Sequence, residues 1–135
     1  MKLIKEKKIR IKNENDFLNG RGLVKELAEE IELSDLVKTK ITTASSEILR
    51  NMLIHGKGGV IIIRIIEKDN KIGLEVICKD KGVGIPDKEL ALQKGFSTNK
   101  SLGLGLPGAK NLVDEFQLKS ELNKGTVVKL MVWKQ

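Results

Sequence analysis

The chain has 135 residues, a formal net charge of +7 at pH 7, and hydrophobic and charged fractions of 40% and 32%. This length suits one domain, which we expect to span residues 1–135, and the composition excludes a disordered chain. The longest apolar run, residues 60–63, is far below the roughly 20 apolar residues of a membrane-spanning helix, so we expect no membrane contact. Residues 1–8 lack the apolar stretch of a secretory signal, and the single cysteine, Cys78, excludes an internal disulfide; both features favour the cytoplasm.

Positive charge is concentrated at the N-terminus. Six basic residues and one acidic residue lie within residues 1–12, which places +5 there and leaves +2 for the rest of the chain. Such a segment can bind nucleic acid or an acidic partner, but it is also typical of an edge strand whose lysines prevent association between sheets. We favour the edge strand and expect no nucleic-acid partner, because three phenylalanines, one tryptophan and no tyrosine offer little surface for stacking bases.

The chain begins with a predicted strand and a predicted helix. Residues 8–12 alternate basic and apolar side chains, which predicts a half-exposed strand. Residues 13–16 are of the kind that caps helices, and apolar residues at helical spacing follow them as far as Ile31. We therefore expect a helix there, weakened near its start by Gly20 and Gly22.

A second helix and a hairpin are expected next. Ser34 is a typical N-cap, and the helix should stop near Gly56, with an apolar stripe formed by Val37, Ile41, Ala44, Ile48 and Met52. Residues 60–66 carry β-branched side chains at both odd and even positions, which predicts a strand buried on both faces. A turn at residues 69–71 and a strand at 74–79 complete the hairpin.

The last third of the chain predicts a long loop, a helix and a second hairpin. Residues 80–105 are rich in glycine, lysine and serine, and residues 109–116 have a helical pattern. Strands at 118–122 and 126–133 should pair around a turn at 123–125. Because the strands come in hairpins rather than βαβ units, we expect an α+β two-layer sandwich, with helices on one face of an antiparallel or mixed sheet.

A glycine-rich segment, residues 103–108, fits the string G-x-G-x-x-G but is a poor dinucleotide fingerprint. That fingerprint must follow a strand directly, whereas here the polar residues 96–101 precede it. Glycines before a helix still expose backbone N–H groups to an anion, and Pro107 suits a first helical turn. The segment is therefore either a phosphate-binding loop or an ordinary glycine-rich loop.

Two further groups of polar residues are candidates for chemistry. Asp80 continues the core-facing register of the preceding strand, so its carboxylate can accept a hydrogen bond from an exocyclic amine, although a simple turn would have the same composition. Glu47, Asn51 and His55 are spaced four residues apart and share one helix face. Asn51 can ligate Mg²⁺ and Glu47 can act as a base, but a solvated helix face has the same pattern, and His55 suits a cap at the helix end.

The order of these motifs resembles a known superfamily, the GHKL ATPases with the Bergerat ATP-binding fold. The motifs that carry the resemblance are Glu47-x-x-x-Asn51, Asp80-x-Gly82-x-Gly84, Gly103-x-Gly105 and Gly125-Thr126. The resemblance implies that the chain binds ATP and Mg²⁺.

Residue roles follow from the resemblance alone. It implies that Asn51 ligates Mg²⁺ and that Glu47 is the general base for the attacking hydroxyl. It implies that Asp80 binds the adenine amino group, beside Gly82, Gly84 and Thr126. It further implies a lid with Ser97, Thr98 and Lys100, and a triphosphate cradle formed by Gly103, Leu104, Gly105 and Leu106. The anti-sigma relatives have an arginine in the lid, which residues 85–102 lack, so the resemblance leaves the phosphate-neutralising cation open, with Lys94, Lys100 and Lys110 as candidates.

Within the superfamily, the chain resembles the serine/threonine kinases of bacterial partner-switching pathways. The RsbT-type switch kinase of the stressosome is similar at residues 41–47, 95–98, 105–108 and 114–116. This implies a STAS-domain protein as substrate and a downstream effector such as a serine phosphatase. The alternatives are an anti-sigma kinase that sequesters a sigma factor and a nucleotide-gated binding module without turnover.

Overall fold

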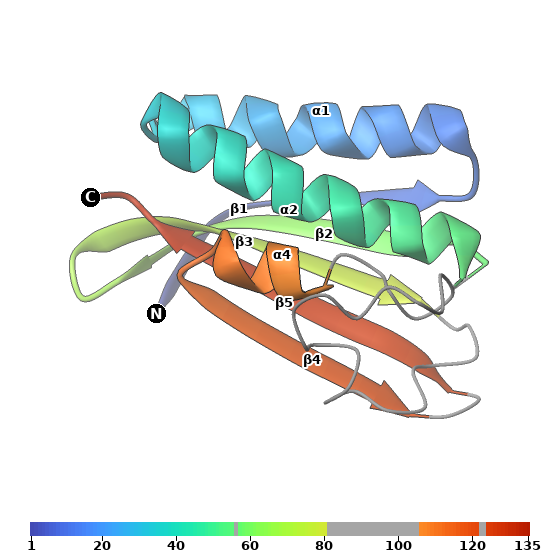
Figure 1. Ribbon diagram of the computed structural model, residues 1–135. Coiled ribbons are helices and arrows are strands. Elements are labelled where there is room, and N and C mark those ends of the chain that lie inside the picture. Colours follow the sequence, from blue (N-terminus) through green and yellow to red (C-terminus); the bar gives the residue numbers. More distant parts are fainter. Residues whose placement is uncertain (56, 81–105, 122–123) are drawn as a thin grey trace.

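A computed structural model describes residues 1–55, 57–80, 106–121 and 124–135. Its helices lie on one face of a sheet, as Figure 1 shows. The elements are β1 (Lys2–Ile11), α1 (Glu14–Glu30), α2 (Asp35–Ile54), β2 (Gly59–Lys68), β3 (Lys71–Asp80), α4 (Leu106–Asn111), β4 (Glu115–Glu121) and β5 (Gly125–Trp133). The expected α+β two-layer sandwich is therefore confirmed.

The sheet of the described residues has five strands in the order β1-β2-β3-β5-β4, and every neighbouring pair is antiparallel. β1 pairs only with β2 and lies at one edge, so the basic N-terminal segment is an edge strand, as favoured from its composition. β3 lies at the centre between β2 and β5, which places its last residue, Asp80, between two neighbouring strands.

The core fills the space between the helices and one face of the sheet. Successive side chains in a strand point to opposite faces, so Ile61, Ile63 and Ile65 face the helices together with the paired residues of β3. On α2 the residues that bury their side chains in this core are Ile41, Ala44, Ile48, Leu49 and Met52. The other face of β2 also buries Ile62 and Ile66, which confirms the prediction that this strand is buried on both sides.

Both long helices begin at the predicted caps. The Asn13 side chain accepts a hydrogen bond from the N–H of Asp16 at 2.8 Å, and Ser34 Oγ accepts one from the N–H of Val37 at 3.2 Å. α1 continues through Gly20, where a Cβ would lie 3.2 Å from Ile11 Cδ1, so the small residue allows the helix to approach the sheet closely. No helix within the described ranges is both long and apolar enough to span a bilayer.

Several predicted boundaries are wrong: β3 begins at Lys71 rather than at residue 74, β4 at Glu115 rather than at residue 118, and the first strand and the last helix differ most. The first strand runs over Lys2–Ile11 rather than 8–12, because pairing with β2 continues along nearly its whole length. The last helix covers Leu106–Asn111 rather than 109–116. The last two residues of the predicted helix, Glu115 and Phe116, instead begin β4, where Phe116 pairs with Leu130 and adds to the core. Strand pairing and burial outweigh the local helical pattern here.

Candidate functional site

The carboxylate that ends β3 is held by the neighbouring strand. Asp80 lies opposite Thr126 in the β3–β5 ladder, and its Oδ1 accepts a hydrogen bond from the N–H of Thr126 at 3.2 Å. Both side chains are half-buried. The structure thus brings together two residues that are 46 positions apart and that sequence reasoning assigned to the same adenine site.

A third residue, the hydroxyl-bearing Ser120, joins this pair and was missed by sequence reasoning. Ser120 Oγ lies 3.1 Å from Thr126 Oγ1 and donates to the Gly125 carbonyl oxygen at 3.3 Å. Ser120 and Thr126 are register partners across β4 and β5, whereas a turn at residues 123–125 would have paired residue 122 with Thr126, so the predicted hairpin did not bring Ser120 to this position.

The last turns of α2 lie against the end of β3. A Cβ on Gly59, the register partner of Asp80, would be 2.7 Å from Met52 Sδ and 3.0 Å from Asp80 Cα. Only glycine therefore allows this contact between the helix and the strand. Asn51 precedes Met52, so the helix turn that carries it meets the sheet at the same end as Asp80, as Figure 1 shows for the elements.

Glu47 and Asn51 are one helical turn apart on α2. Glu47 is exposed, whereas Asn51 is half-buried. The N–H of His55 donates to the Asn51 carbonyl oxygen at 2.8 Å, so His55 is the C-cap of α2, as its position predicted. An exposed carboxylate beside a half-buried amide can accept a proton from a hydroxyl in solvent while the amide oxygen ligates a cation.

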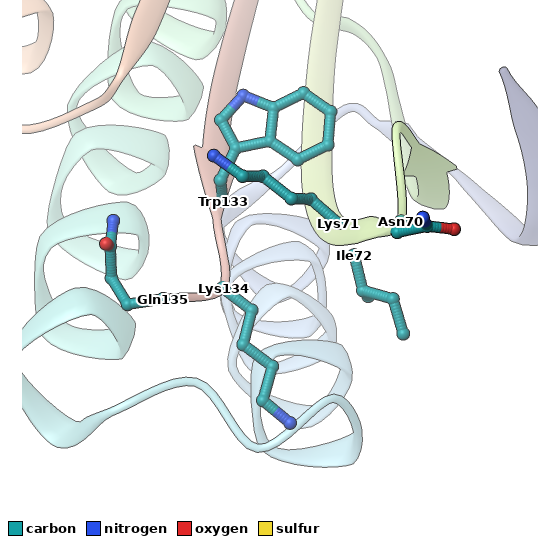
Figure 2. A pocket seen from close by; sticks show the side chains of 6 residues that line it. All are labelled: Asn70, Lys71, Ile72, Trp133, Lys134 and Gln135. Carbon is teal, nitrogen blue, oxygen red and sulfur yellow. The ribbon is translucent and has the colours of Figure 1, made fainter.

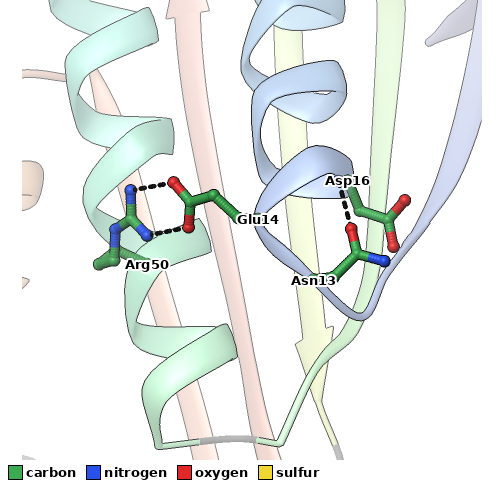
Figure 3. Close-up of polar contacts among 4 residues, drawn as sticks. All are labelled: Asn13, Glu14, Asp16 and Arg50. Carbon is green, nitrogen blue, oxygen red and sulfur yellow. Dashed lines mark hydrogen bonds and ion pairs between the residues drawn. The ribbon is translucent and has the colours of Figure 1, made fainter.

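An ion pair also joins α2 to α1 close to Glu47 and Asn51 in the sequence. Arg50 forms two hydrogen bonds to the Glu14 carboxylate, at 2.6 and 3.0 Å, which Figure 3 shows. Its guanidinium lies 3.9 Å from the centre of the Phe17 ring. The hydrogen bonds from Arg50 lower the pKa of Glu14, and those with Glu14 raise the pKa of Arg50. This contact restrains the part of α2 that carries Glu47 and Asn51.

Several predicted site residues lie outside the described residues: Gly82, Gly84, Ser97, Thr98, Lys100, Gly103, Leu104 and Gly105, together with the candidate cation Lys94. Leu106 is described and begins α4, but its side chain is only 2% exposed and belongs to the core. Only the backbone of Leu106, and not its side chain, can therefore take part in the predicted triphosphate cradle. Lys110 is exposed on the same helix.

Two cavities lined by described residues do not include Asp80. One of about 370 Å³ is lined by Asn70, Lys71, Ile72, Trp133, Lys134 and Gln135 (Figure 2). It lies at the opposite end of β3 and β5 from the Asp80–Thr126 pair. It is therefore not the predicted nucleotide site.

The oxygen donors of the described residues suit a cation that is held mainly by the phosphates of a bound nucleotide. Among the described residues, no group of three or more His, Cys, Asp or Glu side chains could hold a metal ion. Mg²⁺ in phosphate sites commonly takes one or two protein oxygens, several waters and the phosphates themselves. The amide oxygen of Asn51 is a suitable single protein ligand of that kind.

Comparisons with known proteins show the family of the chain. Residues 36–135 match the family described as "Histidine kinase-, DNA gyrase B-, and HSP90-like ATPase". The chain is 40% identical over 126 residues to "Serine/threonine-protein kinase RsbT" of Bacillus subtilis (strain 168), covering 93% of this chain and 94% of that one. It is 41% identical over 99 residues to "Anti-sigma F factor" of Geobacillus stearothermophilus, covering 68% of this chain and 66% of that one.

A solved structure has the same fold. Part of the crystal structure of the RsbU and RsbW domains of a Mycobacterium tuberculosis protein superposes on this chain with a TM-score of 0.64 at 21% identity. The match covers 98% of this chain and 34% of the longer chain.

Proposed function

We propose that this chain is the switch kinase of a bacterial stressosome pathway. It belongs to the histidine kinase-, DNA gyrase B- and HSP90-like ATPase family and, within that family, to the RsbT-related serine/threonine-protein kinases. As a member of that family it binds ATP and acts as a protein serine/threonine kinase in partner switching. The substrate, the residue roles, the metal and the cytoplasmic location are parts of the proposal.

The reaction is a phosphoryl transfer from ATP to a protein hydroxyl. The hydroxyl oxygen bonds to the γ-phosphorus, the bond from that phosphorus to the β–γ bridging oxygen breaks, and ADP leaves. The hydroxyl proton passes to the Glu47 carboxylate, a contribution that is typically worth about 10²–10⁴ in rate. Asn51 would hold Mg²⁺, which supplies charge neutralisation to the phosphates when bound.

One observation carries the proposal: an exposed Glu47 lies one turn from the half-buried Asn51, on a helix that meets the sheet where Asp80 and Thr126 are paired. Asp80 would accept a hydrogen bond from the adenine amino group. The hydroxyls of Thr126 and Ser120 would lie beside the adenine, because a hydrogen bond between them holds the two side chains together.

For the substrate we propose a STAS-domain protein. Phosphorylation would add roughly −1.5 to −2 charge to its interface with the kinase and so weaken the complex. The released kinase would then bind a downstream effector such as a serine phosphatase.

A second candidate function is anti-sigma activity, in which the chain sequesters a sigma factor. It is favoured by the 41% identity to an anti-sigma F factor over 99 residues. A sigma factor that competes with the STAS-domain protein for the chain would support this alternative.

The test is a mass-spectrometric transfer assay with purified chain, Mg-ATP and a STAS-domain protein encoded near its gene. We expect one phosphate on a serine or threonine of that protein. Glu47→Gln should abolish transfer and leave ATP binding intact. The matched control is Glu29→Gln, which changes an exposed carboxylate of α1 and should transfer at the wild-type rate.

Two results would count against the kinase. Transfer by Glu47→Gln at the wild-type rate would exclude Glu47 as the base. ATP-dependent binding of the STAS-domain protein without any phosphate on it would favour a nucleotide-gated binding module.

A further inference from the structure

Two large apolar side chains on α2 are directed to solvent. Leu36 is 64% exposed and Ile54 is 62% exposed, although the opposite face of the same helix is fully buried in the core. Scattered apolar residues on a surface need no explanation, so their position relative to other residues decides whether they matter.

Leu36 and Ile54 lie on one line with the proposed base. At about 100° per residue, Leu36, Thr43, Glu47 and Ile54 lie within roughly 40° of one another around the helix axis. All four side chains are exposed. We call this line the α2 stripe. Glu47 lies between its two apolar ends, about 16 Å from Leu36 and about 10 Å from Ile54 at 1.5 Å rise per residue.

The neighbours of α2 leave the stripe open. α1 and α4 both contact α2, Arg50 of α2 reaches Glu14 of α1, and the buried residues of α2 face the sheet. Thr43 and Glu47, between the two apolar ends, are exposed as well. A partner can therefore lie along the whole stripe without displacing a described side chain from the core.

We propose that the α2 stripe is the docking surface for the protein substrate, an inference that rests on the kinase function proposed above. A protein that presents a hydroxyl to Glu47 has to cover the middle of the stripe. A standard interface buries about 800 Å² on each partner, which corresponds to a patch roughly 30 Å across. The stripe is about 27 Å long, so a substrate centred on Glu47 reaches Leu36 and Ile54 as apolar anchors.

The same placement explains release of the product. Once the hydroxyl is phosphorylated and Glu47 has released the accepted proton to water, the phosphate charge lies next to the Glu47 carboxylate and between two apolar contacts. Like-charge repulsion and desolvation of the phosphate both weaken the complex there. The stripe thus binds the unmodified substrate and rejects the phosphorylated one.

The main test compares Leu36→Ala, Ile54→Ala and their double variant in the transfer assay, with the STAS-domain protein that the wild type phosphorylates as the probe. Each single change should raise the KM for that protein about tenfold, and the double change about a hundredfold. The Kd for ATP should stay within about twofold of the wild type. Ile4→Ala, which truncates a 48% exposed residue on β1, is the matched control and should leave both constants unchanged.

A cross-linking measurement supplies independent evidence. Cys78 is buried, so Leu36→Cys and Ile54→Cys each provide one accessible thiol for a photoreactive maleimide. Both labelled variants should cross-link to the STAS-domain protein, and a labelled Ile4→Cys should not.

The outcomes separate the two proposals. If the wild type transfers phosphate and the double variant keeps its KM for the STAS-domain protein, the docking surface is wrong and the kinase function stands. If the wild type transfers none, the proposed function fails, and the inference with it. If sedimentation shows a wild-type dimer that dissociates in the double variant, the stripe binds a second copy and the inference is overturned.

Discussion

The backbone N–H of Thr126 donates a hydrogen bond to Oδ1 of Asp80 at 3.2 Å, across the register pair that joins β3 and β5. One carboxylate oxygen of Asp80 is therefore held by the sheet. A carboxylate oriented in this way can accept a hydrogen bond from an adenine amino group at little further entropic cost.

Asp80→Asn should weaken ATP binding. The amide keeps an oxygen that can accept from Thr126, so we expect the fold to be retained. The substitution removes the negative charge that strengthens the hydrogen bond from adenine, so the Kd for ATP should rise about ten- to a hundredfold. Isothermal titration calorimetry measures this change. Asp69→Asn is the control, since Asp69 lies in the β2–β3 turn at φ 53°, a conformation that asparagine adopts readily. Equal affinity in both variants would argue against Asp80 as the adenine ligand.

The contact between Arg50 and Glu14 should make stability depend on pH. The hydrogen bonds from Arg50 lower the pKa of Glu14 in the folded chain. Such a group stabilises the folded state above its unfolded pKa, which is about 4.3 for Glu, and the contribution is lost as the pH falls through the lower folded value. Glu14→Gln should therefore lower the Tm slightly at neutral pH, and the difference should vanish in acid.

Thermal denaturation followed by circular dichroism at several pH values checks this expectation. Because the ion pair is exposed, 1 M salt at neutral pH should also reduce the difference. Glu29→Gln on the same helix serves as the control. A Tm difference that stays constant from neutral pH into acid would contradict the assignment of the effect to the Glu14 charge.

Local pattern was sufficient for most of the fold. The caps at Asn13 and Ser34 and the sequence of helices and strands along the chain were predicted correctly, because each depends on neighbouring residues in the sequence. The order of the strands within the sheet was not predicted, because β3 pairs with β5 across a large separation in sequence. The boundary of α4 was not predicted, because it depends on β5. Asp114 accepts a hydrogen bond from the N–H of Trp133 at 2.7 Å, and such a contact leaves no local signal.

The candidate site shows the same division. Glu47 and Asn51 were proposed from their helical spacing, Asp80 from its register in the preceding strand, and Thr126 from the order of motifs that resembles the GHKL superfamily. The restraint by Arg50 was missed, since its partner Glu14 is 36 residues away and belongs to a separate helix. Long-range pairs of this kind follow from the packing of α1 on α2 and not from a periodic pattern.

Cys78 should be unreactive in the folded chain. Burial raises the pKa of its thiol to about 12, and the nearby charge of Asp80 acts in the same direction. At pH 8 only about one thiol in ten thousand is then ionised, and the sulfur is also inaccessible. A disulfide reagent such as DTNB should label the wild type only as fast as the chain opens. Leu36→Cys should react at once on its exposed thiol and so supplies the control. Rapid labelling of the wild-type chain would show that the end of β3 opens frequently.

Gly59 and Gly22 should respond in opposite ways to the same substitution. A Cβ at Gly59 would clash with the Lys79 carbonyl oxygen and lie 2.7 Å from Met52 Sδ, so the pairing of β2 with the end of β3 has to shift and Met52 has to repack. Gly59→Ala should destabilise the chain by about 2–3 kcal/mol and weaken ATP binding, because the end of β3 that carries Asp80 moves relative to α2. Gly22 lies in α1 with nothing within 4 Å of a Cβ, so Gly22→Ala should stabilise the chain by about 0.5–1 kcal/mol. Urea denaturation measures both values. Wild-type stability in Gly59→Ala would mean that the last turn of α2 does not depend on its contact with the end of β3, and the placement of Asn51 relative to Asp80 would lose its support.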